Sequence, residues 1–85
     1  MPKYHFHAKD GRTYPDRDGT TLPNDDAARI EAAKVLGDFL REKPDELWAD
    51  QSFRLTVTDH ADLTLFVLEV TVTESPAAAA PRGPP

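Results

Sequence analysis

A chain of 85 residues with a formal charge of −5 can form one small domain, and its scattered basic residues lack the patch typical of nucleic-acid-binding proteins. The absence of cysteine excludes disulfides and thiolate zinc sites. No apolar run approaches the ~20 residues of a membrane span, and the amino end lacks the layout of a signal peptide. We therefore expect a cytoplasmic protein without nucleic-acid or membrane partners.

The chain opens with a strand pattern over residues 3–9. The sequence KYHFHAK alternates in the way that is typical of a half-buried strand. The inward set is Tyr4, Phe6 and Ala8, and the outward set is His5 and His7. Asp10-Gly11 is a turn signal, and residues 12–14 can run back as a short partner strand. A second tight turn at residues 16–19 leads toward the helix.

Residues 25–43 carry the only long helical pattern. At about 100° per residue, seven apolar side chains fall within one arc, and charged side chains occupy the opposite arc. The apolar arc holds Ala28, Ala32, Ala33, Val35, Leu36, Phe39 and Leu40. Asn24 is the expected N-cap, and Pro44 ends the helix. Asp25 and Arg29 have the spacing of an i,i+4 ion pair.

Two more strands follow a short connection. Residues 45–51 link the helix to the sheet, and Leu47 and Trp48 within them are expected to cover one end of the core. The sequence SFRLTVT at residues 52–58 alternates cleanly, with its apolar side chains inward. Residues 59–62 form a predicted hairpin turn, and the last strand is expected over residues 63–73.

The last predicted strand has apolar side chains on both faces. One parity holds Phe66, Leu68, Val70 and Val72, and the other holds Leu63, Leu65 and Val67. Either a bulge near Val67 reverses the register and hides both sets, or the outer face keeps an apolar patch around Leu65 and Val67. The strand also outruns its hairpin partner. An overhanging, β-branched edge of this kind favours pairing with another chain.

The histidines are the candidate metal ligands. His5 and His7 project from one face of the first strand, a spacing that recurs in metal sites, and His60, Asp59 or Asp62 would have to supply a third ligand. Two ligands alone do not make a site. The alternative is that both histidines are outer-face residues, with His7 bonded to a backbone group in the nearby turn. No metal and no other cofactor is predicted.

Aspartates cluster in the first turns without completing a calcium loop. Asp10, Asp16 and Asp18 resemble the start of such a loop, but the bidentate glutamate that should follow is missing. Their expected role is to accept hydrogen bonds from backbone N–H groups of the turns. The sequence contains neither a G-x-S-x-G elbow nor a phosphate-binding glycine loop. We predict no catalytic residue and no enzyme activity.

An ordered set of short signatures resembles one known bacterial family. The chain begins MPKYHFH, continues with Asp10-Gly11 and with PDRDGTTLP at residues 15–23, and then has an alanine-rich helix and a strand that ends in Thr58-Asp59. Over residues 1–70 this order is similar to domain-of-unknown-function family 6894, short proteins common in soil and plant-associated alphaproteobacteria.

The resemblance has two departures. His7 matches the family pattern, whereas His5 and the turn at residues 59–62 differ from it. The resemblance implies the boundaries and the order of the elements, and it supplies no catalytic residues.

These patterns predict an α+β fold with ββαββ order, in which one long helix packs on one face of an antiparallel sheet of about four strands. The domain is expected over residues 1–75, and the Ala/Pro-rich residues 76–85 are expected to form a disordered tail. The first strand should lie centrally, beside the third or fourth. The predicted core consists of Tyr4, Phe6, Val35, Leu36, Phe39, Leu40, Phe53, Leu55, Val57, Leu68 and Val70.

The sequence favours a non-catalytic protein-interaction module that forms a homodimer through its sheet or its long last strand, because a domain of this size has a marginal core. The predicted interaction surface is His5, His7, Leu63, Leu65 and Val67. One alternative is a metal- or small-ligand-binding domain that uses His5, His7 and His60. Another is an accessory subunit with an unidentified protein partner and the tail as a tether.

Overall fold

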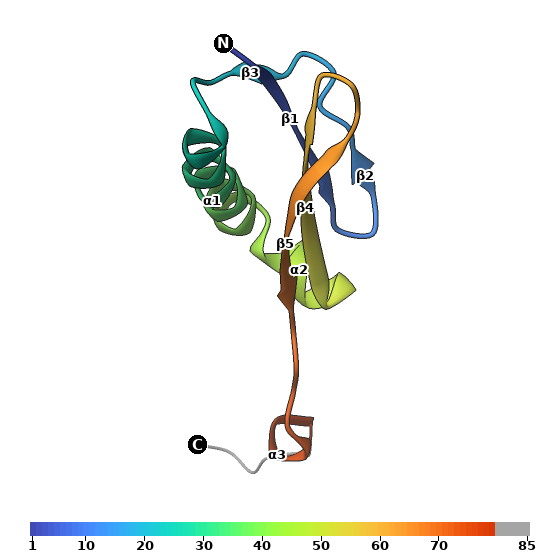
Figure 1. Ribbon diagram of the computed structural model, residues 1–85. Coiled ribbons are helices and arrows are strands. Elements are labelled where there is room, and N and C mark those ends of the chain that lie inside the picture. The colour runs from blue at the N-terminus through green and yellow to red at the C-terminus, as the bar shows by residue number, and fades with distance from the viewer. Residues whose placement is uncertain (80–85) are drawn as a thin grey trace.

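The computed structural model describes residues 1–79 and has two layers, a long helix and an antiparallel sheet (Figure 1). Its elements in chain order are β1 (Lys3–Lys9), β2 (Thr13–Tyr14), β3 (Thr20–Thr21), α1 (Asp25–Glu42), α2 (Pro44–Asp50), β4 (Ser52–Asp59), β5 (Thr64–Thr71) and α3 (Pro76–Ala79). The ββαββ prediction is confirmed, with β3 and the short helices α2 and α3 added to it.

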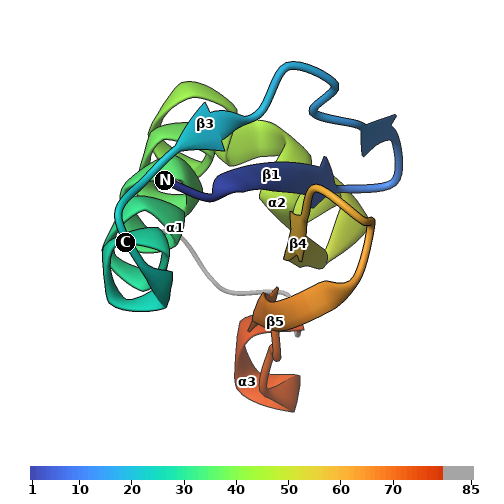
Figure 2. The ribbon, with the colours of Figure 1, turned by 45° about the horizontal axis from the view of Figure 1, so that its top comes forward.

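The sheet has the strand order β2-β1-β4-β5, and all its pairs are antiparallel. β3 also pairs with β1, so the two short strands β2 and β3 share the same edge of β1. The predicted central position of the first strand, beside the SFRLTVT strand, is confirmed. Figure 2 shows β5 at the opposite margin of the sheet from β3.

α1 begins and ends where the sequence predicts. The Asn24 side chain accepts a hydrogen bond of 2.9 Å from Ala27 N–H, and Pro44 opens α2 directly after α1. The predicted pair of Asp25 and Arg29 is wrong. Arg29 binds Asp26 at 2.7 Å instead, because the Asp25 carboxylate accepts a hydrogen bond from the buried Tyr4 hydroxyl, also at 2.7 Å.

Small residues hold the centre of the core. Ala28 and Ala32 of α1 are fully buried against the sheet, so the helix backbone approaches the strands closely. The larger residues of the apolar arc lie at the rim of this contact, where they are half-buried. The buried cluster consists of Tyr4, Phe6, Ala8, Ala28, Ala32, Phe53, Leu55 and Val57.

The predicted core is therefore correct for β1 and β4 and needs correction for β5 and α1, because Leu68 and Val70 are only half-buried. Val35, Leu36 and Phe39 pack against the buried cluster from its side, and Leu40 is half-buried without belonging to it. Trp48 does not cover the core as predicted and is 59% exposed, because α2 turns its Leu47 inward instead.

The carboxyl end of the described chain leaves the sheet after β5. Residues 76–79 form α3, which lies clear of the sheet in Figure 1, and residues 80–85 of the predicted tail lie outside the described residues. The disordered tail stays a prediction. Within residues 1–79, none of the helices combines the length and the apolar character needed to span a membrane.

The bond between Tyr4 and Asp25 predicts an alkaline titration. The hydrogen bond to Asp25, together with burial and the charge of Asp25, raises the pKa of Tyr4 to about 12 from its ordinary value of 10.0. The stabilisation that Tyr4 contributes is therefore complete below pH 10.0 and is lost as the pH rises toward about 12. In a Tyr14→Phe variant, where Tyr4 is the only tyrosine, absorbance at alkaline pH should give a midpoint of about 12.

The matched variant for this titration adds Asp25→Asn. Removal of the charge should bring the midpoint toward 10.0, while circular dichroism shows that the fold persists. A midpoint near 10.0 with Asp25 intact would mean that the Tyr4 hydroxyl does not bind the carboxylate in solution.

Candidate functional site

The sheet face opposite α1 is predominantly polar. The strand register places His7 beside Thr56 and Thr56 beside Val67, and it places Lys9 beside Arg54 and Arg54 beside Glu69. Successive side chains alternate between faces, so these two rows lie on the face that points away from the core. Val67 is the apolar member of the two rows.

The two histidines of β1 are fastened to the loop that follows β2. His5 Nδ1 lies 2.9 Å from the carbonyl oxygen of Asp16, and Asp16 N–H donates to His7 Nδ1 at 3.0 Å. The other ring nitrogen of His7 lies 3.1 Å from the buried Thr58 hydroxyl, and the two rings stack with their centroids 6.0 Å apart. The prediction that His7 binds a backbone group of the nearby turn is confirmed.

The Asp16 carboxylate completes an attachment that we call the Asp16 clip, formed by His5, Phe6, His7, Asp16 and Gly19. One carboxylate oxygen accepts from Phe6 N–H at 3.1 Å, and the other accepts from Gly19 N–H at 3.1 Å. Phe6 lies between the β1 residues that pair with β2 and those that pair with β3. The side chain of Asp16 therefore takes the place of a strand along this stretch of the β1 edge.

Gly19 is needed for the shape of the clip. Its φ of +73° lies in the left-handed region, and a Cβ atom there would lie 2.9 Å from the ring of His5. The glycine therefore lets the loop close against the histidine.

Asp16 stays ionised more readily than a free aspartate. Burial alone would raise its pKa, but the hydrogen bonds from Gly19 and Phe6 and the nearby imidazoles of His5 and His7 outweigh burial and lower the pKa. The carboxylate thus keeps both backbone bonds through the neutral pH range.

The predicted metal ligands do not come together with other ligand-type side chains. His60 lies exposed in the β4–β5 turn, and residues 1–79 contain no group of three or more His, Cys, Asp or Glu side chains that could hold a metal ion. Asp59 serves that turn, since its carboxylate accepts from Ala61 N–H at 2.8 Å and from Leu63 N–H at 3.0 Å. Asp10 acts in the same way on Arg12 N–H. The turn role expected of Asp10 and Asp16 is thus confirmed, whereas no side-chain hydrogen bond of Asp18 is recorded in residues 1–79.

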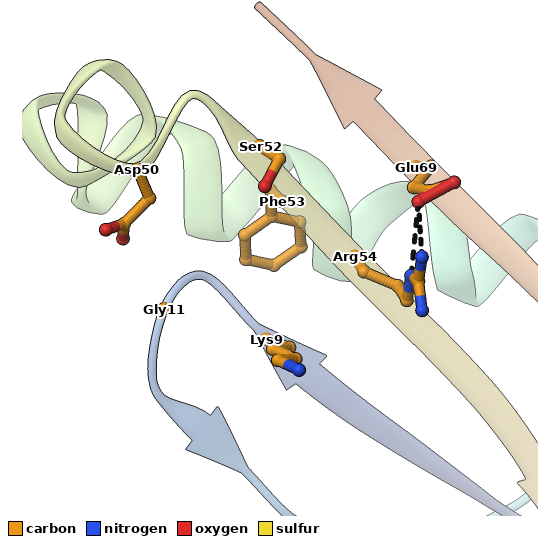
Figure 3. Close-up of a pocket in the computed structure, with 7 residues that line it drawn as sticks. All are labelled: Lys9, Gly11, Asp50, Ser52, Phe53, Arg54 and Glu69. Atoms are coloured by element: carbon orange, nitrogen blue, oxygen red, sulfur yellow. Dashed lines mark hydrogen bonds and ion pairs between the residues drawn. The ribbon is translucent and has the colours of Figure 1, made fainter.

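A cavity of about 300 Å³ opens where the β1–β2 turn meets the end of α2 (Figure 3). It is lined by Lys9, Gly11, Asp50, Ser52, Phe53, Arg54 and Glu69. The Arg54 guanidinium binds one oxygen of Glu69 at 2.8 and 3.2 Å, so two of the charges at this cavity neutralise each other. Ser52 supplies a hydroxyl there, and histidine is not among the lining residues.

A second cavity of about 320 Å³ lies on the other side of the same turn and shares Gly11 and Asp50. A hydrogen bond with Asp10, together with burial, raises the pKa of Glu46, and the nearby Lys43 only partly opposes this effect. Glu46 of α2 therefore lies close to the β1–β2 turn, and the two residues line this cavity together.

β5 is the least covered strand of the central sheet. The inward residues of β1 and β4 are buried, whereas none of the residues of β5 is. Leu63 is 63% exposed and Val67 is 47% exposed. Beside them, Arg29 and residues 66–68 line a shallow cavity of about 280 Å³, with the Arg29 guanidinium 5.7 Å from the centre of the Phe66 ring.

A bulge decides which apolar residues of β5 stay exposed. Val57 pairs with Phe66 and Thr58 pairs with Thr64, which leaves Leu65 as an extra residue in β5. Leu65 packs against the core, so the predicted exposed surface is wrong for Leu65. Both sequence alternatives are thus partly correct, because the bulge hides Leu65 while Val67 remains on the outer face.

The outer edge of β5 carries unpaired backbone groups. Among the described residues the sheet ends at β5, and Val72 N–H donates to Gln51 O at 2.9 Å on the β4 side. Backbone N–H and C=O groups of successive residues point alternately to the two sides of a strand. The groups of Val67, Glu69 and Thr71 therefore point to the free side. β5 contains neither proline nor lysine, the residues that commonly block such edges.

A family model described as a domain of unknown function, DUF6894, matches residues 3–71, from the first residue of β1 to the last residue of β5. The chain belongs to the DUF6894 family. The sequence resemblance is thereby confirmed, and the matched region ends where the regular structure of the sheet ends. Comparison of this DUF6894 domain with curated proteins and with solved structures finds no match.

Sequence reasoning missed two contacts that shape this DUF6894 domain. They are the bond between Tyr4 and Asp25 and the Asp16 clip. The Pro15–Gly19 signature was the available signal for the clip. It indicated a turn without showing that the turn binds back to β1.

The Asp16 clip predicts a measurable loss of stability. Asp16→Ala leaves the N–H groups of Phe6 and Gly19 without their acceptor, which should lower the free energy of unfolding by about 1–2 kcal/mol at pH 7. Because the pKa of Asp16 is lowered from 3.8, its contribution is complete above pH 3.8 and is lost as the pH falls below that value. The difference between the native chain and the variant should therefore shrink in acid. Urea titrations at several pH values measure it.

Asp18→Ala is the matched control for Asp16→Ala. Asp18 is an exposed aspartate of the same loop and makes no side-chain hydrogen bond that the structure of residues 1–79 records. Equal losses in the two variants would show that the clip does not hold the loop.

Proposed function

We propose that this DUF6894 domain is a non-catalytic protein-interaction module that forms a homodimer through the free edge of β5. The observation that carries the proposal is the position of β5, which combines an unpaired edge, an incompletely covered inner face and the exposed Val67. The proposal includes the cytoplasmic location expected from the sequence.

Edge pairing is favoured over packing through the outer face. That face presents the charged pair of Arg54 and Glu69 and the histidines of the Asp16 clip, and burial of such groups without new partners is costly. The β5 edge instead offers N–H and C=O groups that gain partners when another strand is added.

A second copy of the chain suits this edge. A two-fold axis places the same strand opposite itself, so the half-buried apolar side chains of β5 meet identical side chains. An added strand would also cover the inner face of β5, where α1 leaves the Phe66 and Leu68 side chains partly exposed. The size of the domain supports this proposal, because small cores gain most from association.

The alternative ligand site at His5, His7 and His60 stays a prediction. The clip already uses both Nδ1 atoms of the histidine pair, and nothing at these residues favours a ligand over the loop. Association with another protein is likewise left as an outcome of the experiment below.

Val67→Glu tests the proposed dimer. The change places a negative charge on the outer face of the edge strand, where it should raise the dimer dissociation constant at least about tenfold, equivalent to about 1.4 kcal/mol. Light scattering and sedimentation over a concentration series measure this constant. Ile30→Glu is the matched control, since Ile30 is an exposed apolar residue on α1, 61% accessible against 47% for Val67.

A monomeric native chain at every concentration would end the proposal, and so would equal weakening by the two glutamate variants. Capture of a different protein by the β5 edge, with the native chain monomeric, would replace the homodimer by a heterologous complex.

Ionic strength gives a separate prediction. Each copy carries a formal charge of −5, so two copies repel one another over distances beyond the contact itself. Added salt screens this repulsion, and the dimer should tighten as the sodium chloride concentration rises from low to physiological values. A dimer that weakens steadily over that range would instead depend on ion pairs between the copies.

A further inference from the structure

The bulge in β5 limits the part of its edge that a partner strand can use. Residues 66–71 follow the bulge at Leu65 and pair with β4 in an unbroken register. Within them, Val67, Glu69 and Thr71 direct their backbone groups to the free side, as the bond from Val72 N–H to Gln51 O fixes. A regular antiparallel partner should therefore centre on this segment rather than on the whole strand.

Self-pairing about a two-fold axis allows few registers for this segment. Residues that face each other across an antiparallel pair lie on the same face of the sheet, so the residue on the axis faces its own copy. The candidates for the axis are Val67, Leu68, Glu69 and Val70, and each gives a different set of contacts. An axis at Val70 pairs only residues 69–71 of the segment, so it uses less of the edge than an axis at Leu68 or Glu69.

An axis at Val67 makes poor use of the edge. It places Glu69 of one strand opposite the partner's Leu65, which is the extra residue of the bulge. Regular pairing would then extend over only the few residues around the axis.

An axis at Glu69 uses Val67, Glu69 and Thr71 of both strands for hydrogen bonds, but it sets two carboxylates directly opposite each other. Like charges in that position destabilise a strand pair. Arg54 cannot relieve the contact fully, because it lies on the β4 side and already binds Glu69 of its own chain at 2.8 Å.

An axis at Leu68 avoids the carboxylate contact and moves the bulge contact outward, because the partner's Leu65 then faces Thr71 at the end of the paired segment. Phe66 then faces the partner's Val70 and Leu68 faces the partner's Leu68 on the inner face, so apolar side chains meet there. On the outer face, Val67 lies opposite the partner's Glu69, and the two carboxylates are kept apart.

We infer that β5 pairs antiparallel with β5 of a second copy with Leu68 on the two-fold axis, and that the Glu69 carboxylate sets this register. The inference rests on the proposed homodimer and adds its geometry. Glu69 thereby determines the specificity of the pairing, since it excludes the register that would otherwise form the longer run of hydrogen bonds.

Cysteine cross-linking tests the register, because the native chain contains no cysteine. Opposed residues of an antiparallel pair have Cα atoms about 4.5–5.5 Å apart, within the range that a disulfide spans. Leu68→Cys should therefore cross-link to itself under mild oxidation. Val70→Cys is the matched control on the same face, and it should not cross-link, because Val70 faces the partner's Phe66.

Two further cross-linking experiments detect the competing registers. They change only residues of the outer face, so the side chains that pack against the core stay intact. Val67→Cys alone would cross-link only with Val67 on the axis. An equimolar mixture of Val67→Cys and Thr71→Cys would form mixed cross-links only with Glu69 on the axis. We expect neither cross-linked product in appreciable yield. If either one were the dominant product, the inferred register would be wrong. This conclusion would hold even if the Leu68→Cys variant failed to fold.

Glu69→Gln then tests the role of the carboxylate. In this background the mixture of Val67→Cys and Thr71→Cys should become cross-linked, and the yield from Leu68→Cys should fall. An unchanged pattern would show that Glu69 does not set the register.

Light scattering on the same samples distinguishes a failure of the proposed homodimer from a failure of the inferred register. A monomer contradicts the homodimer itself. A dimer in which Leu68→Cys folds and does not cross-link contradicts the register alone.

Discussion

The close contact between α1 and the sheet is the constraint on which the rest of the structure depends. Ala28 and Ala32 bring the helix backbone onto β1 and β4, where the aromatic and branched residues are buried. A single helix set this closely covers the middle of the sheet well and its margin poorly. β5 is therefore incompletely covered because of how the helix packs. Its exposed apolar residues belong to the same alternating sequence as its half-buried ones, and the helix does not reach them.

The polar groups of the domain mainly position its backbone. Tyr4 uses Asp25 to hold the start of the helix against β1, and Arg54 uses Glu69 to join β4 to β5 across the outer face. Charged side chains that are already bound within the domain are not free to bind a partner. The unpaired N–H and C=O groups along the outer edge of β5 are therefore the main hydrogen-bonding groups that the sheet can offer to another chain.

The sequence was sufficient for the elements and insufficient for the contacts between them. Period-two alternation predicted β1 and β4 closely, and Asn24 and Pro44 marked the limits of α1. Alternation could not place the bulge at Leu65, because that depends on how the hairpin meets β4. The clip was also out of reach, since the aspartate of a turn signature can bind its own turn or a distant strand, and only the fold decides between them. The alternation also overestimated the exposure of Leu65, which packs against the core, whereas Leu63 and Val67 are exposed as expected.

The Asp16 clip has a consequence for the size of any assembly. A sheet that can add strands at both margins can grow without limit into a fibre. Here the margin beside β1 holds only two strands of two residues each and the Asp16 carboxylate between them, so it offers no long strand edge to another chain. If copies of this chain associate through β5 as proposed, the short strands and Asp16 would disfavour further strand addition beyond the pair.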